Sequence, residues 1–364
     1  MDSPLPENQV LLPDHSDFSA AQIDQALRSL GIVNAVVFQT SGSTGTPRLV
    51  CHSKAGLQAS AAAVNELLDA SASDVWLRAL PLFHVGGFGI IARAEAVKSG
   101  VFELEDGWEA ARFVEACKVH GASLSSLVPT QVFDLVQCEF ACPASLRAVL
   151  VGGGRLDPAL EKRARGLGWP VLRTYGLSEA GSQVATQVGD ELVVLPHLDA
   201  AIDTEGRLKL RGSSMALGYL HRDEDRSWRF DELLGADGWF ETDDLVELDG
   251  RVLRFVGRVS SKVKILGELV DVDALEQALL TMLPSGIEAA LIDVEEARCG
   301  SALVLVIHND VAPAKLEPCI TAFNASVAGF ERIAKVVQVS LIPRGELGKI
   351  RRGELRQMVA ETQK

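Results

Sequence analysis

The residues best suited to binding or catalysis form a loop rich in hydroxyl groups and glycine. The loop reads Thr40-Ser41-Gly42-Ser43-Thr44-Gly45-Thr46-Pro47-Arg48 and comes directly after an apolar run. Glycine lets backbone N–H groups turn inward and hydroxyl groups add donors, so such a loop can bind phosphate oxygens. The Gly-Lys-Ser/Thr ending of a Walker A loop is absent. Taken alone, the composition also fits a plain surface loop, so the assignment depends on the other motifs of the chain.

Six further motifs supply groups that a nucleotide or an acid could contact. They contain glycine-rich turns, a Ser-Glu pair, an aspartate pair and a single lysine in a glycine-bearing loop near the C-terminus. In chain order they are LPLFHVGGFG (80–89), GGGRL (152–156), TYGLSE (174–179), GWFETDD (238–244), FVGR (255–258) and PRGELGK (343–349). Each motif alone is a weak signal, whereas six in one order are specific.

The elements that must position these motifs alternate between strands and helices. Strand-like runs cover 33–38, 75–79, 123–127, 148–151 and 171–173, and helix-like runs cover 20–30, 54–68, 108–120, 131–137 and 158–167. This alternation predicts a mostly parallel sheet with helices on its faces. Short strands separated by Gly and Asp then run from 183 to 256 and predict an antiparallel sheet or a small barrel.

A third pattern begins near Gly257 and predicts a small α+β domain. Helices are expected at 273–282 and 314–327 and at the C-terminus, and strands at 287–294, 302–308 and 334–341. We therefore expect an N-terminal domain over 1–258 and a C-terminal domain over 259–364.

Composition narrows the function classes. The chain has 364 residues, enough for two domains, and 35 Lys+Arg against 49 Asp+Glu give a net charge of −14, which argues against a nucleic-acid groove. No apolar run is long enough for a transmembrane helix, and the N-terminus lacks a signal-peptide pattern, so we expect a cytoplasmic protein without membrane association. The six scattered cysteines fit reduced thiols. The sequence is compatible with a homodimer.

Together the motifs resemble those of the adenylate-forming acyl-CoA synthetase (ANL) superfamily, which includes luciferases and peptide-synthetase adenylation domains. The resemblance covers roughly residues 35–355, and it is strongest to the o-succinylbenzoate–CoA ligases of menaquinone synthesis. It rests further on the stretches PLFHVGGFGIIAR, SLVPTQ, LRAVLVGGG and LRGSSMALGY. It implies a large N-terminal domain with a small β subdomain and a small mobile C-terminal domain. Relatives usually have more residues before the phosphate loop, and Arg48 and Ser178 replace their usual Lys and Thr.

The resemblance implies a two-step reaction. A substrate carboxylate attacks the α-phosphorus of ATP and releases pyrophosphate, and the thiol of coenzyme A then attacks the acyl-adenylate and releases AMP. Because a carboxylate is already ionised at pH 7, the first step needs positioning and positive charge rather than a base. The resemblance assigns that charge to Lys349. The alternative for Lys349 is a solvated lysine in a basic C-terminal stretch.

The ATP and metal residues are also implied by the resemblance. Glu179 would bind Mg²⁺, which accepts one or two carboxylates with phosphates and waters; a helix cap formed by Ser178 and Glu179 is the structural alternative. Thr44, Lys349 and Glu179 are the expected catalytic residues. Phosphate contacts fall on Thr40, Ser41, Gly42, Ser43, Thr44, Gly45 and Ser178, and adenosine contacts on Gly153, Gly154, Arg155, Thr174, Tyr175, Gly176, Asp244 and Arg258.

Two residues carry the prediction of the acid substrate. Arg93 matches the arginine that recognises the non-reacting carboxylate of o-succinylbenzoate, and a guanidinium binds a carboxylate with two hydrogen bonds. Its alternative is an exposed helix arginine paired with Glu95 or Glu103. His84 is expected to line the acyl pocket without transferring a proton.

The last implied roles concern coenzyme A and motion. Gly267 would line the channel for the pantetheine arm, and Ser260 would be the hinge about which the C-terminal domain rotates between the two steps. An ordinary turn glycine and a linker turn are the alternatives. At the level of function, the alternatives are another aryl- or acyl-acid ligase and a non-catalytic nucleotide-binding member of the family.

Overall fold

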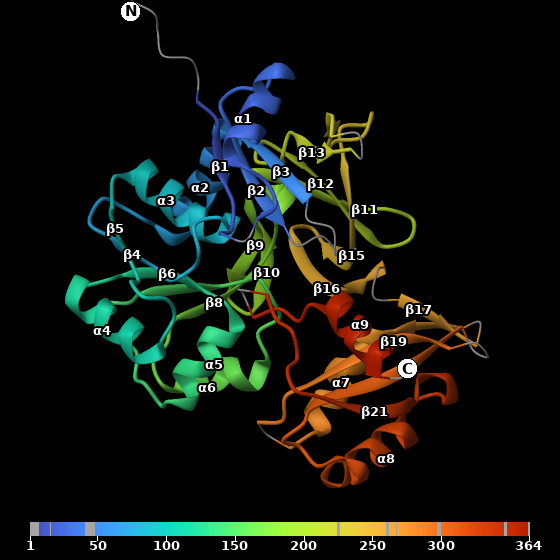
Figure 1. Cartoon of the computed structure of the whole chain (residues 1–364). Helices are drawn as coiled ribbons and strands as arrows, with labels where there is room; N and C mark the ends of the chain where they lie inside the picture. The colour runs from blue at the N-terminus through green and yellow to red at the C-terminus, as the bar shows by residue number, and fades with distance from the viewer. Residues whose placement is uncertain are drawn as a thin grey trace, which may run out of the picture. The chain divides into compact units, whose positions relative to one another are not determined.

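The computed structural model describes most of the chain and divides it into two compact units. The described residues are 7–14, 16–40, 48–223, 226–259, 262–266, 268–284, 286–296, 300–345 and 348–362. The first unit contains the described residues up to Thr242 together with Leu248–Arg254. The second contains Asp243–Glu247 and the chain from Phe255 onward. Figure 1 colours the chain along its length.

An eleven-stranded sheet forms the centre of the first unit, in the order β11-β12-β15-β16-β10-β9-β8-β7-β6-β4-β5. Its parallel half consists of β4 (Val75–Arg78), β5 (Gly100–Glu103), β6 (Leu124–Leu127), β7 (Ala148–Val151) and β8 (Val171–Leu177). The other half consists of β9 (Ser182–Val188), β10 (Glu191–Val194), β11 (Leu198–Ile202), β12 (Arg207–Gly212), β15 (Phe240–Asp249) and β16 (Val252–Arg258).

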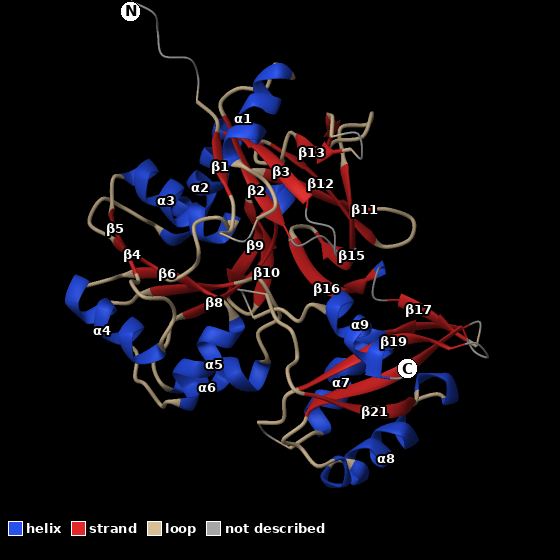
Figure 2. Ribbon diagram, in the orientation of Figure 1, coloured by secondary structure: helices blue, strands red, loops and turns tan. Residues whose placement is uncertain are grey.

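Helices cover both faces of the parallel half, as Figure 2 shows. On one face lie α4 (Ala110–His120), α5 (Pro129–Gln137) and α6 (Pro158–Gly166), and on the other lie α2 (Lys54–Leu68) and α3 (Val85–Val97). Each face of the sheet forms a hydrophobic core with its helices, and successive strand residues point to opposite cores. Leu77 packs with α4 and α5, and Trp76 packs with α2 and α3. The predicted parallel sheet with flanking helices is therefore confirmed.

The strands after residue 183 do not form a small barrel, so that alternative is wrong. The first of them, β9, pairs antiparallel with β8 and thereby extends the central sheet. Strand β10 continues the sheet by pairing with β9 and with β16. Because the edge of the parallel sheet accepts six of these strands and the other two join a second sheet, they have no need to close on themselves.

A five-stranded sheet lies beside the central one in the first unit, in the order β1-β2-β3-β13-β14. Its strands are β1 (Gln9–Leu11), β2 (Ala35–Thr40), β3 (Arg48–Ser53), β13 (Gly218–Arg222) and β14 (Trp228–Glu232), and α1 (Ala20–Ser29) packs on one face. Strands β2 and β3 pair antiparallel, with Thr40 opposite Arg48. The predicted phosphate loop connects these two paired ends, and its residues 41–47 lie outside the described residues.

The second unit is an α+β domain with two sheets. Strands β17 (Lys262–Ile265) and β18 (Glu268–Asp271) pair with each other, and β19 (Ala289–Glu296), β20 (Gly300–His308) and β21 (Ile333–Val339) form a three-stranded sheet. Helices α7 (Val272–Met282) and α8 (Glu317–Ser326) pack on one face of that sheet, and α9 (Arg352–Thr362) packs on the other. None of the helices among the described residues is long and apolar enough to cross a membrane.

Candidate active site

Three of the six predicted motifs and the stretch SLVPTQ meet at one edge of the central sheet. The segments after β4, β6 and β7 and the end of β8 all leave the sheet at the carboxyl ends of parallel strands. The register places Leu127 opposite Val151 and Val151 opposite Arg173, so the residues after them are neighbours. Ligands of open α/β sheets bind at this edge.

The glycine motif after β7 lies directly against β8. A Cβ atom on Gly152 would come within 2.5 Å of the Thr174 hydroxyl, which donates to the Val151 carbonyl at 3.1 Å. Only glycine permits this close approach. The next residue, Gly153, has φ +78° and is exposed, as are the two residues after it. The main chain of the predicted adenine-binding segment is therefore open to a ligand.

The turn that carries Glu179 is held by hydrogen bonds from distant parts of the chain. It consists of a short 3-10 helix, η1 (Ser178–Ala180), followed by Gly181. Each of the four successive carbonyl oxygens accepts a hydrogen bond from a group distant in the sequence. The donors are His52 Nε2 at 2.7 Å, the Ala216 N–H at 2.7 Å, the Ser214 hydroxyl at 2.8 Å and the Ser60 hydroxyl at 2.9 Å.

His52 is buried in β3, and burial lowers its pKa to about 4, so the ring is neutral at pH 7. Since a carbonyl only accepts, the proton of the ring lies on Nε2. Sequence reasoning assigned no role to His52, Ser60 or Ser214. The sequence held no clear signal for them, because the strand that contains His52 was itself not expected. The helix cap considered for Ser178 and Glu179 does not form, because Leu177 is the N-cap residue and no side chain caps the turn.

The carboxylate of Glu179 contacts a tyrosine to which sequence reasoning also assigned no role. The Tyr219 hydroxyl donates to Glu179 Oε1 at 2.8 Å. The guanidinium of Arg48 lies over the Tyr219 ring, with Cζ 5.6 Å from the ring centroid. The described residues contain no cluster of three or more metal-binding side chains. A single carboxylate is nonetheless what Mg²⁺ requires when phosphates and waters supply the other ligands, so Glu179 fits that role.

Arg93 is the most deeply buried cation among the described residues of the first unit, with 1% of its surface exposed. Its guanidinium lies 3.5 Å from the Ser126 hydroxyl, with Cζ 5.6 Å from the Trp76 ring, and fills the space beside Gly89. Within the described part of the chain, Nε has no hydrogen-bond partner. Burial lowers the pKa of Arg93 to about 10, and no carboxylate of the described residues offsets this effect, yet the group stays charged at pH 7.

The alternative of an exposed helix arginine is therefore wrong. Glu103 pairs with Arg78 instead of Arg93. His84 is the N-cap residue of α3, and burial lowers its pKa to about 4, so its ring is neutral at pH 7. The Arg93 guanidinium reaches back to Gly89 in the first half of the same helix. His84 and the tip of the Arg93 side chain thus both lie beside the N-terminal half of α3.

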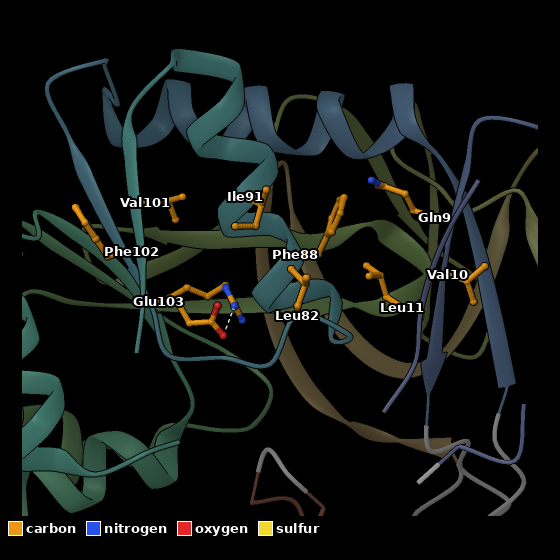
Figure 3. Close-up of a pocket in the computed structure, with 10 residues that line it drawn as sticks. Gln9, Val10, Leu11, Leu82, Phe88, Ile91, Val101, Phe102 and Glu103 are labelled. Carbon is orange, nitrogen blue, oxygen red and sulfur yellow. Dashed lines mark ion pairs between the residues drawn. The ribbon is translucent and has the colours of Figure 1, made fainter. Parts of the chain in front are cut away.

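A separate cavity of about 500 Å³ lies on another face of α3. Figure 3 shows side chains from β1, α3 and β5 around it, including Phe88 and Phe102, with the Arg78–Glu103 ion pair at one side. None of the predicted site residues lines this cavity. We therefore leave this cavity out of the candidate site, which consists of the predicted residues at the carboxyl edge of the central sheet.

In the second unit, three predicted residues influence one another electrostatically. Arg258 Nε contacts the buried Asp244 carboxylate at 2.6 Å. Lys349 is exposed and sits in a tight loop, where the Gly345 N–H donates to its carbonyl at 2.7 Å. Partial desolvation and then the charge of Arg258 lower the pKa of Lys349, while Asp273 and Asp244 raise it. Five predicted phosphate-loop residues (Ser41, Gly42, Ser43, Thr44 and Gly45) and Ser260 and Gly267 lie outside the described residues.

Known proteins resemble the chain in both sequence and fold. The family model described as AMP-binding enzyme matches residues 33–220. A 2-succinylbenzoate–CoA ligase of Enterococcus faecalis is 29% identical over 76% of the chain, and a probable 2-succinylbenzoate–CoA ligase of Mycobacterium tuberculosis is 30% identical over 88%. The chain spans 60% and 83% of these two relatives, respectively.

Among solved structures, the o-succinylbenzoate CoA synthetase (MenE) of Bacillus subtilis in complex with the acyl-adenylate intermediate OSB-AMP resembles the chain with a TM-score of 0.75. It is 25% identical, and the match covers 88% of the chain and 68% of the synthetase. The predicted membership of the ANL group is therefore confirmed. With a family model matching more than half of its length, the chain belongs to the family of AMP-binding enzymes.

Proposed function

We propose that the chain is an ATP-dependent, AMP-forming acid–CoA ligase whose acid is o-succinylbenzoate. The observation that carries the proposal is Arg93, a buried cation without a carboxylate partner among the described residues. Burying an unpaired charge is costly, so such a site favours an anionic ligand. o-Succinylbenzoate has two carboxylates, of which only one reacts. The relatives named as 2-succinylbenzoate–CoA ligases support the same choice.

In the first step the reacting carboxylate oxygen bonds to the α-phosphorus of ATP, and the bond to pyrophosphate breaks. Two anions must approach each other, so catalysis depends on positioning and on positive charge. We assign the charge to Lys349, whose ammonium can contact both the carboxylate and the α-phosphate.

The proposed ATP contacts fall on the motifs that the family resemblance selects. Glu179 would hold Mg²⁺, and Thr44 would stabilise the phosphates during transfer. Magnesium, when bound, neutralises charge on the phosphate oxygens. Phosphate oxygens would contact Thr40, Ser41, Gly42, Ser43, Gly45 and Ser178. The adenosine would contact Gly153, Gly154, Arg155, Thr174, Tyr175, Gly176, Asp244 and Arg258.

In the second step the sulfur of coenzyme A bonds to the acyl carbon, AMP leaves, and the thiol proton passes to solvent. Gly267 would line the channel for this thiol. We keep the proposed domain boundary at 258/259, with Ser260 as hinge of a mobile C-terminal domain. His84 and Arg93 would orient the acid. A cytoplasmic location and a homodimer remain part of the proposal.

The test is a panel of carboxylic acids incubated with the protein, ATP and Mg²⁺, first without and then with coenzyme A. We expect pyrophosphate release with o-succinylbenzoate, and its thioester by mass spectrometry once coenzyme A is added. Turnover of a different acid would correct the substrate. Nucleotide binding without pyrophosphate release for any acid would establish a non-catalytic member of the family.

A further inference from the structure

Tyr219 belongs to none of the proposed substrate contacts, yet it touches the proposed metal carboxylate. It lies on β13, opposite Val50 of β3. Figure 1 shows β13 in the five-stranded sheet, which also contains β2 and β3, the two strands that the predicted phosphate loop connects. Its hydroxyl donates to Glu179 Oε1 at 2.8 Å. Among the described residues Tyr219 is the only side chain that hydrogen-bonds to this carboxylate.

The two oxygens of the Glu179 carboxylate differ in their contacts, since only Oε1 accepts the hydrogen bond from Tyr219. A phenol hydroxyl on Oε1 fixes the rotation of the carboxylate and occupies one lone pair. No hydrogen bond to Oε2 is formed by the described residues, so this oxygen is available to a cation. An ordinary phenol is protonated at pH 7, so the Tyr219 hydroxyl has the proton that it donates. Oxygen ligands with such supporting donors are better oriented toward a metal.

Both the backbone and the side chain of Glu179 are held from the same stretch of chain. The Ala216 N–H donates to the Glu179 carbonyl at 2.7 Å, and three residues later Tyr219 donates to the carboxylate. Arg48, over the Tyr219 ring, is the last residue of the predicted phosphate loop and one of its two described residues. Tyr219 therefore connects the end of that loop to Glu179.

We propose that Tyr219 is a positioning residue that holds Glu179 Oε1 so that Oε2 is presented to the magnesium of bound Mg·ATP. This proposal rests on the proposed function for the metal and the nucleotide, and it is independent of which acid is activated. Removing a supporting group of this kind typically weakens metal binding about 10- to 100-fold. We expect a loss of that size when the hydroxyl is removed.

The experiment compares the full-length protein with Tyr219→Phe, which keeps the ring under Arg48 and loses only the hydroxyl. Mn²⁺ replaces Mg²⁺, and its binding is followed by electron paramagnetic resonance in the presence of α,β-methylene-ATP. The affinity for AMP without metal is measured on the same sample. The ratio of the two affinities does not depend on the folded fraction, because both ligands bind the same folded molecules.

Two further variants complete the design. His221→Phe is the matched control, because His221 lies two residues along β13 and pairs with Asp231 rather than with Glu179. It should leave Mn²⁺ binding unchanged. Glu179→Gln removes the proposed metal ligand, and adding Tyr219→Phe to it should cause no further loss, because the hydroxyl acts only through that carboxylate.

Each outcome separates this proposal from the proposed function. Mn²⁺ binding by Tyr219→Phe within about twofold of the wild type would overturn the role of Tyr219 alone. An equal loss of AMP affinity would also overturn it, because that result indicates a general structural effect. A wild type that binds Mn²⁺ and nucleotide but activates no acid would leave the role intact and refute the ligase. Absence of Mn²⁺–nucleotide binding in the wild type would refute both.

Discussion

Replacing Arg93 by leucine should separate a substrate-binding arginine from a structural one. The side chain is buried, and its contacts among the described residues are a 3.5 Å approach to Ser126 and the Trp76 ring. A structural arginine in such a position would normally have a carboxylate partner. If the partner is instead the free carboxylate of the substrate, Arg93→Leu should damage binding and spare the fold.

The expected effects of Arg93→Leu on KM and on stability follow from the contacts of the side chain. Loss of a charge-assisted pair costs about 1.5–3 kcal/mol, which corresponds to a roughly 10- to 150-fold rise in KM. Since the interaction forms in both the ground and transition states, kcat should change little. Stability should not fall, because leucine removes an unpaired buried charge and fills part of its volume with apolar atoms.

The assay measures pyrophosphate release against the concentration of o-succinylbenzoate and of a monocarboxylic aryl acid. All five tryptophans lie in the first unit, so their fluorescence reports its unfolding in urea. Arg147→Leu is the matched control. Arg147 forms two 2.8 Å contacts with the Asp74 carboxylate, so its loss should destabilise the unit by about 2 kcal/mol without changing acid preference.

Two results would refute the reasoning. An equal rise in KM for both acids would show that Arg93 does not bind the second, non-reacting carboxylate of o-succinylbenzoate. A loss of stability in Arg93→Leu as large as that in Arg147→Leu would show that the buried guanidinium has a structural role.

Three other perturbations test separate parts of the proposal. Lys349→Ala should slow adenylate formation roughly 100- to 1,000-fold yet spare thioester formation from supplied acyl-adenylate; equal losses in both steps would contradict its role. Ser260→Pro should leave pyrophosphate exchange nearly intact and slow thioester formation at least about tenfold, because proline fixes φ; a wild-type thioester rate would place the hinge elsewhere. Asp74→Asn should destabilise the first unit by about 2 kcal/mol at pH 7. Arg147 holds the pKa of Asp74 below its usual range, so this stability is present above about pH 4 and is lost as pH falls further. Urea unfolding should therefore show the difference from wild type shrinking in acid, and a constant difference would be inconsistent with the ion pair.

Local signals in the sequence were sufficient for most helices. The expected helix at 54–68 matches α2, because Ser53 caps it by accepting from the Gly56 N–H. Asp157 caps α6 in the same way, with Pro158 at the first helical position. The strand expected from residue 33 begins only at Ala35, because Asn34 has φ +56° and cannot extend the strand. Such boundaries depend on single residues that a hydrophobic pattern does not resolve.

The strand β3 was not expected, and its pairing explains why. It holds the polar residues His52 and Ser53, which suggest a loop when the sequence is read alone. In the structure β3 lies between β2 and β13, so both of its edges are paired. Strand β13 lies far along the chain, and no local pattern in β3 indicates that partner. The buried state of Arg93 was equally out of reach, since a lone arginine in a helix is usually exposed.

The turn around Glu179 depends both on a local sequence motif and on contacts with residues distant in the sequence. Its motif is contiguous, so the sequence alone was enough to select Glu179 as a candidate ligand. Its geometry comes from groups 126, 121, 34 and 40 residues away, which hold the carbonyls of the turn and the carboxylate itself. A carboxylate held on both its main chain and its side chain loses little further freedom when it binds a cation, so less of the binding energy is spent on ordering it. The folded first unit, rather than the motif, therefore sets how firmly Glu179 is oriented. If Glu179 binds the metal as we propose, substitutions at these distant donors should lower the affinity for that metal.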